Sequence, residues 1–174
     1  TRVRSSAASD VYKRQETVLA ILVVSFGIGS AGGTFLLAGV RNERHKGLLL
    51  LSMGVLSGLS PLLLGFSFNI SMAFIATLVM GATESIFMAL TSTYVQLVTP
   101  DRLRGRVTSL YILHAGGIMA FANLGYGYLA DLYNAQNVLI ITGLLFFIFF
   151  TGISSTDPIL KSVYKGKDVS ELAS

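Results

Sequence analysis

The sequence has no cysteine and no tryptophan, and only 13% of its 174 residues are charged. Without cysteine the chain can form neither a disulfide framework nor a thiolate metal site. An average soluble domain carries roughly 25% charged residues, so this chain has too little charge to cover a globule in water. Apolar residues make up 52% of the chain and the mean hydropathy is +0.67, and both values point to a membrane protein.

Charged residues are absent from four long stretches, residues 17–40, 47–83, 107–130 and 132–156. A stretch of about 18 apolar residues is already a candidate membrane helix. A helix over 47–83 would be about 55 Å long, too long for a hydrocarbon core of about 30 Å, so it should break at the polar residues 67–71. The sequence therefore predicts an all-α, polytopic membrane protein. Its five spans are expected over residues 17–40, 47–67, 71–98, 106–130 and 137–156.

Lysine and arginine occur at alternate connections between these spans and in the tail 157–174, whereas the connections near 68–70 and 131–136 have none. The basic residues in the connections are Arg41, Arg44, Lys46, Arg102, Arg104 and Arg106. The positive-inside rule places these connections and the C-terminal tail in the cytoplasm, with the bacterial plasma (inner) membrane as the expected location. Basic residues confined to short connections and tails also argue against a nucleic-acid partner, despite the net charge of +4.

Residues 1–15 break the charge rule, because five spans with a cytoplasmic C-terminus put this basic segment outside. The segment also lacks the apolar core of a signal peptide. Its letters RSSAASDVYKRQ resemble a translated sequencing adapter fused to a truncated reading frame. We therefore expect residues 1–15 to be a non-native, disordered leader; the alternative is a short polar tail. The membrane domain is expected over residues 16–156.

The most specific motif covers residues 96–111 and reads QLVTPDRLRGRVTSLY. A proline after a membrane helix ends it, and an aspartate suits the positive end of the next helix. The string resembles the connection between helices 10 and 11 of major facilitator superfamily transporters, and most closely the enterobactin-exporter-like efflux branch. The motif residues are Pro100, Asp101, Arg102, Arg104, Gly105 and Arg106. Residues 125–131, GYGYLAD, resemble the end of helix 11 in the same branch.

A second, degenerate motif covers residues 39–47 and reads GVRNERHKG. It resembles the superfamily's Gly-x-x-x-Asp-Arg loop in its position between helices 8 and 9. The motif residues are Gly39, Glu43, Arg44 and Lys46. Glutamate replaces the family's aspartate and the Gly-Arg-Arg end is missing, which weakens the conformational-lock role that the family attaches to this loop.

The resemblance implies that the five spans correspond to helices 8 to 12, a fragment of the C-terminal half, with the N-terminal half of the same transporter as a missing partner. It also implies a proton-coupled exporter of small molecules, siderophore-like or drug-like, that works by alternating access. The alternatives are a non-transporting membrane scaffold and a membrane-embedded enzyme. No phosphate-binding Gly-x-x-x-x-Gly-Lys loop is present in the sequence, so no ATP-driven motor is expected in this chain.

Glu84 is the one acidic residue inside the apolar part of a predicted span, near the middle of 71–98. A charge there costs at least about 2.5–3.5 kcal/mol on insertion scales, so the side chain should face a cavity or a partner. It is either a proton-coupling or substrate-cation site, or a protonated carboxyl group bonded to a neighbouring helix. Thr77, Met88 and Thr91 share its approximate face at helical spacing. Thr91 joins Glu84 as a candidate for the substrate path.

Two further polar candidates lie in the span 106–130. His114 can titrate near neutral pH, and Asn123 can contact polar groups of a substrate from a different face. Hydrogen bonding within the helix bundle is the alternative for both. Tyr111, near the expected start of the span, is interpreted as an interfacial anchor. The one histidine and the one glutamate inside the predicted spans lie on different helices without ligand spacing, which argues against an enzyme and predicts no metal and no cofactor.

The glycine pairs Gly29–Gly33 and Gly54–Gly58 have the small-xxx-small spacing that lets two membrane helices approach closely. We expect them to serve helix packing and not substrate binding. The lipid bilayer, a small-molecule substrate and protons complete the expected partners.

Overall fold

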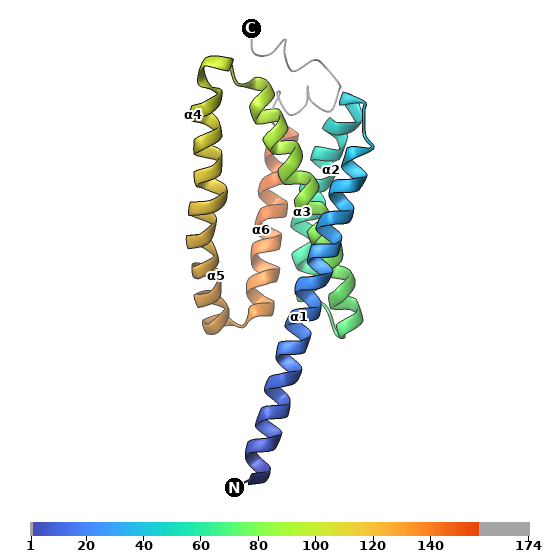
Figure 1. Cartoon of the computed structure of the whole chain (residues 1–174), viewed down its shortest axis with the longest axis vertical. Coiled ribbons are helices and arrows are strands. Elements are labelled where there is room, and N and C mark those ends of the chain that lie inside the picture. The colour runs from blue at the N-terminus through green and yellow to red at the C-terminus, as the bar shows by residue number, and fades with distance from the viewer. Residues whose placement is uncertain (1, 157–174) are drawn as a thin grey trace.

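The structure is a computed structural model that describes residues 2–156, with side chains described for residues 13–42 and 45–156. Every element in this part of the chain is a helix (Figure 1). The elements are α1 (Arg2–Ala38), α2 (Glu43–Gly65), α3 (Ile70–Val98), α4 (Asp101–Ile112), the π-helix η1 (Leu113–Ile118), α5 (Met119–Tyr133) and α6 (Ala135–Thr156). Because α4, η1 and α5 follow one another directly, they form one continuous helix, which we call the Asp101–Tyr133 helix.

Within the described residues, five helices are long and apolar enough to cross a membrane, as the sequence predicts. The break expected at residues 67–71 is also present. The helix α2 ends at Gly65, and the Asn69 side chain accepts a hydrogen bond from the Met72 N–H at 2.8 Å, so it caps the start of α3. The fold class is therefore an all-α polytopic membrane protein. The predicted tail 157–174 lies outside the described residues.

The start of the fourth span differs from the sequence prediction. The fourth span begins at Asp101 and not at residue 106, because Pro100 occupies the N-cap position and Asp101 lies in the first turn. A carboxylate is favourable at the positive end of a helix, and a proline there requires no backbone donor. The residues of this motif from Asp101 to Arg106 consequently belong to the first turns of α4 and not to a loop.

The disordered leader expected over residues 1–15 is wrong for residues 2–15, whose backbone continues α1 down to Arg2 (Figure 1). These residues contain neither proline nor glycine. Helix nucleation is the unfavourable step, and the apolar span that follows already supplies the nucleus, so each added residue needs only to propagate it. The non-native origin of the segment stays a prediction.

Helices α1 and α3 are packed closely through glycine. A Cβ atom built on Gly29 would overlap the Leu78 carbonyl group, and one on Gly33 would lie 2.6 Å from the Ala82 carbonyl oxygen. From the other side, a Cβ on Gly81 would overlap the Phe26 carbonyl. The prediction that Gly29 and Gly33 serve helix packing is thus confirmed.

Polar atoms also join α1 and α3. Ser25 and Thr77 are buried and hydrogen-bonded to each other, and the Ser85 hydroxyl donates to the Ser30 carbonyl at 3.1 Å. A buried hydroxyl without a partner is costly, so these bonds satisfy groups that lipid could not. They fix the register of the two helices.

Helix α2 packs against both α3 and α6. Leu50 meets Ile86 and Leu90 of α3 in a small buried apolar cluster. On the other side, a Cβ on Gly58 would lie 2.9 Å from the Phe147 Cα, and one on Gly54 would overlap the Phe150 ring. The second predicted glycine pair is therefore also a packing device.

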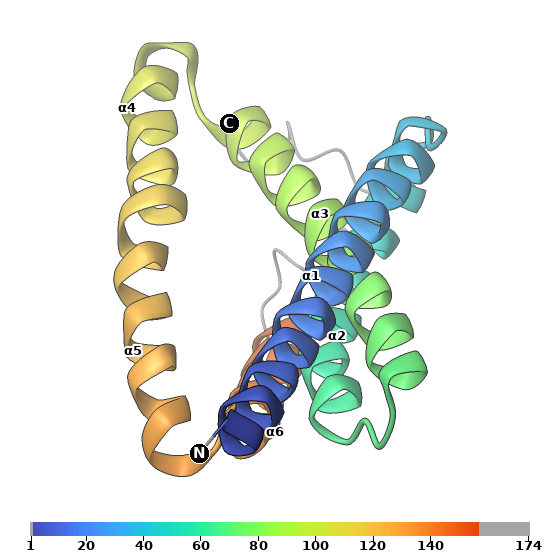
Figure 2. The same ribbon diagram turned by 60° about the horizontal axis from the view of Figure 1, so that its bottom comes forward.

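The Asp101–Tyr133 helix has a different environment from the other four spans. None of the residues in its apolar window is buried, whereas 39% of the window of α3 is buried. Figure 2 shows it standing apart from α1 and α2, close to its neighbours mainly near its two ends. Its connections are short: Thr99 and Pro100 at the start, and Asn134 alone, with a φ of 74°, at the end.

Candidate functional site

Glu84 lies on the face of α3 that the closely packed helices α1 and α2 do not cover. At 3.6 residues per turn, Gly81 and Ser85 lie toward α1, which they contact, and Ile86 lies toward α2. Phe87 points to α6, where its ring centroid is 5.6 Å from that of Phe150. The remaining direction includes Glu84 and Met88, and Tyr111 of the Asp101–Tyr133 helix contacts Met88 there.

The Glu84 carboxylate is partly buried, and it makes no hydrogen bond or ion pair with any residue that the structure describes. Near a bilayer midplane such a group is costly, by at least about 2.5–3.5 kcal/mol when charged, unless a proton, a cation or water compensates it. Glu84 can therefore hold a proton or contact a positively charged group. The alternative of a carboxyl group bonded to a neighbouring helix finds no partner in the described part of the chain.

Thr91 lies two turns beyond Glu84 on the same face of α3. Its hydroxyl oxygen is buried and has no hydrogen-bond partner among the residues described here. Thr77, which the helical spacing also assigns to this face, is instead turned to α1, where it is bonded to Ser25. The structure thus keeps Glu84, Met88 and Thr91 together and removes Thr77 from the group.

His114 and Asn123 lie on the neighbouring helix. His114 is the second residue of η1 and Asn123 belongs to α5, and both side chains are exposed. No hydrogen bond joins either of them to Glu84 or Thr91 in the described structure. Their role on the substrate path accordingly stays a prediction, and it depends on what covers this helix. The described residues contain no group of histidine and acidic side chains that could hold a metal ion.

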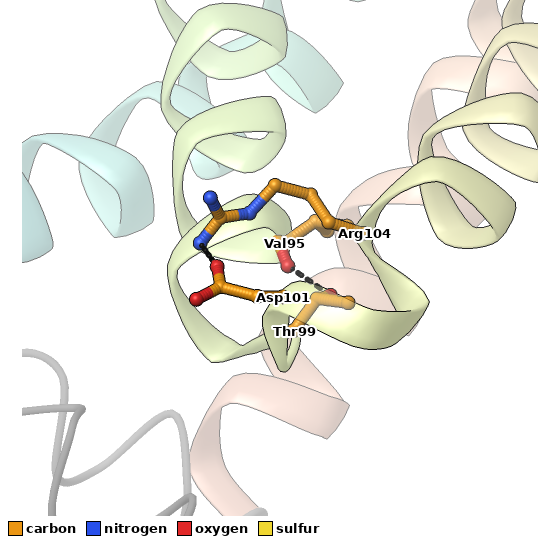
Figure 3. Close-up of polar contacts among 4 residues, drawn as sticks. All are labelled: Val95, Thr99, Asp101 and Arg104. Atoms are coloured by element: carbon orange, nitrogen blue, oxygen red, sulfur yellow. Dashed lines mark hydrogen bonds and ion pairs between the residues drawn. The ribbon is translucent and has the colours of Figure 1, made fainter.

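The motif at residues 96–111 forms the compact junction of α3 and α4 (Figure 3). The Thr99 hydroxyl donates to the Val95 carbonyl at 2.5 Å, and Arg104 contacts Asp101 at 2.8 Å. The ion pair is mostly exposed, so it contributes no more than about 1 kcal/mol. Arg102 and Arg106 are exposed as well and remain accessible to lipid phosphates.

The degenerate motif occupies the turn between α1 and α2. The Gly39 N–H donates to the Leu36 carbonyl at 3.2 Å, which closes the last turn of α1. The Lys46 N–H donates to the Asn42 carbonyl at 3.1 Å in the first turn of α2. The side chains of Glu43 and Arg44 lie outside the described residues, so the conformational-lock role stays untested.

Tyr111 has a role that the sequence did not reveal. Its hydroxyl donates to the Met88 carbonyl at 3.3 Å and lies 3.9 Å from the Met88 sulfur, so it connects α4 to the candidate face of α3. The expected start at residue 106 placed Tyr111 near the membrane interface. With the start at Asp101, it lies about 15 Å from the start of the helix at 1.5 Å per residue, and its hydroxyl group is bonded to a neighbouring helix. The interpretation of Tyr111 as an interfacial anchor stays a prediction.

The chain matches the sequence profile of the transmembrane secretion effector family over residues 7–162. The match includes residues 7–15 of the expected leader. No curated protein and no solved structure matches the chain. The match covers the five apolar helices up to Thr156 except for the first residues of α1. From the helices and the profile together, we conclude that this chain is an integral membrane protein of the transmembrane secretion effector family, a group of major-facilitator-type transporters.

Proposed function

We propose that the chain is part of a proton-coupled exporter of small drug-like or siderophore-like molecules that works by alternating access. The observation that supports this most directly is Glu84, an unpartnered carboxylate in the middle of a membrane helix. Intramembrane carboxylates that face a cavity are typical of proton relays and ion pathways. The family itself consists of transporters, which favours transport over an enzymatic reaction or a scaffold role.

The coupling follows from competition at one carboxylate. Glu84 can hold a proton or the positive group of a substrate, but the two exclude each other because one negative charge is compensated only once. Release of a proton on one side then accompanies binding of the substrate, and the reverse occurs on the other side. The proton gradient of the bacterial plasma membrane thereby drives export.

Charge further divides the two substrate classes. An ionised Glu84 attracts a cationic amphipathic molecule and repels an anionic one such as a catecholate siderophore. No arginine or lysine lies within hydrogen-bond reach of Glu84 in the described structure to reverse this preference. We therefore place cationic drug-like molecules ahead of siderophore-like ones.

The proposal includes a second half of the transporter as partner. The Asp101–Tyr133 helix carries His114 and Asn123 yet has no buried residue in its apolar window. Polar groups such as these are costly when they face hydrocarbon, and an opposing set of helices would cover them. We expect the N-terminal half of the transporter to supply that cover.

Transport in vesicles tests the function. Proteoliposomes with the complete transporter and an acidic interior are expected to accumulate ethidium, a cationic probe, as protons leave. An anionic catecholate chelator should accumulate less, by roughly tenfold or more if one charge contact of about 1.4 kcal/mol decides the preference. This chain alone should transport neither probe. Absence of pH-driven uptake of both probes by the complete transporter would favour the scaffold alternative, and uptake by this chain alone would contradict the need for a second half.

Cysteine accessibility tests the proposed orientation, and the native chain offers no cysteine to interfere. Arg102→Cys is expected to react with an impermeant maleimide only after the cells are opened. Gln136→Cys, at the start of α6, should react in intact cells because it lies at the connection without basic residues. The reverse pattern would invert the topology, while labelling of both sites in intact cells would show that the chain does not hold one orientation.

A further inference from the structure

We propose that an exposed stripe at the start of the Asp101–Tyr133 helix is a binding site for an anionic phospholipid. Arg102 and Arg106 bind the phosphate of the head group, and Leu110 and Leu113 lie along one of the acyl chains. The ligand class is a phospholipid with a net negative head group, such as phosphatidylglycerol. Lipid binding there involves no transport and goes beyond the proposed function.

The spacing of these four residues places them on one side of the helix. Counted from Arg102, the other three follow after four, eight and eleven residues, which keeps all of them within about 80° at 3.6 residues per turn. Tyr111, which is bonded to Met88 of α3, lies nine residues after Arg102 and therefore on the opposite side of the helix. The stripe accordingly points away from α3.

The two arginines of the stripe are available to an anion. Both are exposed, and neither side chain has an ion-pair or hydrogen-bond partner among the residues that the structure describes. The neighbouring carboxylate of Asp101 is paired with Arg104 at 2.8 Å (Figure 3). Guanidinium groups without a counter-ion favour a phosphate, because its oxygens accept several of their N–H donors at once.

The arginines also lie at the end of the bundle where the basic connections gather. Figure 1 places the junction of α3 and α4 at the same end as the turn between α1 and α2, which carries the exposed Arg41. The connections without lysine or arginine, residues 66–69 and Asn134, lie at the other end. Basic residues at one membrane face attract anionic lipids, so the head-group level is the expected surrounding of Arg102 and Arg106.

The apolar half of the stripe distinguishes a lipid from free phosphate. Leu110 and Leu113 lie one and two turns beyond Arg106, about 6 and 10 Å further along the helix at 1.5 Å per residue. Their side chains are 65% and 60% exposed. A phospholipid has the same order, with the charged phosphate at the surface and hydrocarbon below it. Charge and apolar surface along the stripe therefore match the two parts of one lipid molecule.

The absence of tryptophan from the chain lets a single introduced tryptophan report on each position. Leu110→Trp reports on the stripe. Leu124→Trp is the control reporter, because Leu124 is 72% exposed and lies as many residues from the other end of the same helix. The full 174-residue chain is placed in nanodiscs of mixed phosphatidylglycerol and phosphatidylcholine. One lipid at a time carries brominated acyl chains, which quench tryptophan on contact, and the comparison gives the relative binding constant at each position.

The Leu110→Trp reporter is expected to prefer phosphatidylglycerol at least about fivefold, the effect of one basic residue near an anionic lipid. Arg102→Gln and Arg106→Gln should each lower this preference, and the double variant should abolish it. The Leu124→Trp reporter should show no preference. Arg104→Gln is the matched control, since it removes the same charge from a paired arginine on another side of the helix, and it should lower the preference less than Arg102→Gln does.

Three results in this chain would overturn the site. The first is a Leu110→Trp reporter without a preference for phosphatidylglycerol. The second is an equal loss in Arg102→Gln and Arg104→Gln, which would show that the total charge of this end attracts the lipid. The third is displacement of the lipid by inorganic phosphate at constant ionic strength, which would assign the arginines to free phosphate. Circular dichroism of each variant verifies that the helices are intact.

The complete transporter provides the last test. The preference of the Leu110→Trp reporter should persist there, because the stripe is proposed to face lipid. Its loss in the complete transporter would show that the second half covers this face and would overturn the site. None of these measurements depends on uptake. A transporter that lacks pH-driven uptake but keeps the lipid preference would refute the proposed function alone, and normal uptake without the preference would refute the lipid site alone.

Discussion

Glu84→Gln in the complete transporter is expected to remove the dependence of transport on the pH gradient. Glutamine has nearly the same size and can still form hydrogen bonds, but it neither releases a proton at physiological pH nor carries a charge. The factor by which an imposed pH gradient stimulates transport should fall roughly ten- to hundredfold, the range of typical coupling between two ligands. Uptake of ethidium down its own gradient, measured without a pH difference, isolates binding and conformational change from coupling.

Two variants accompany this experiment. Glu84→Asp keeps the carboxyl group on a side chain that is one methylene shorter. It should therefore retain part of the coupling that Glu84→Gln removes. Asp131→Asn removes an exposed carboxylate at the end of α5, away from the candidate face, and should transport as the parent does. A Glu84→Gln protein that retains the normal response to the pH gradient would assign Glu84 a structural role and would leave the proton pathway elsewhere.

Gly29→Ala is expected to weaken the packing of α1 on α3 by roughly 1–3 kcal/mol. The added methyl group would overlap the Leu78 carbonyl, which belongs to the main chain and cannot rotate away. The helices must therefore separate, and the Ser25–Thr77 hydrogen bond beside this contact would lengthen. The free energy of unfolding, measured by titration with sodium dodecyl sulfate in mixed micelles, reports this loss. Gly81→Ala acts at the same interface, so the double variant should lose less than the sum.

The same helix provides matched controls. A Cβ atom on Gly27 or on Gly32 would meet nothing within 4 Å. Alanine in a helix interior is more favourable than glycine by roughly 0.5–1 kcal/mol, so these two variants should be neutral or slightly stabilised. We thus expect alanine to lower the free energy of unfolding at Gly29 and to leave it unchanged or raise it at Gly27 and Gly32. Equal effects at Gly27 and Gly29 would contradict the close approach of α1 and α3.

The spans could be predicted because the limits that define them are physical lengths. The bilayer thickness required a break, the polar residues 67–71 located it, and the Asn69 cap confirms it. The start at Asp101 was missed because the three arginines were assigned to a loop, whereas an N-terminal turn tolerates them when an aspartate and a proline are present. The π-helix was missed as well, since hydrophobic periodicity does not distinguish it from an α-helix over six residues.

The candidate site could be predicted only in part. Helical spacing placed Glu84, Met88 and Thr91 on one face, because that relation depends on a single helix. It also placed Thr77 there, and contact with Ser25 of another helix overrode the spacing. The bond from Tyr111 to Met88 joins residues 23 positions apart, so no local pattern contains it. Contacts between helices decide these cases, and a sequence read one span at a time does not reveal them.

The short connections at both ends of the Asp101–Tyr133 helix limit how this helix can move. Thr99 and Pro100 fix it to α3, and the single residue Asn134 fixes it to α6. With so little chain at either end, it cannot slide along its axis or rotate about it without pulling its neighbours. It can only bend between two fixed points, and the wide turn of η1 lies between them. Any motion that this helix contributes is therefore a flexing of its middle, and not a piston stroke.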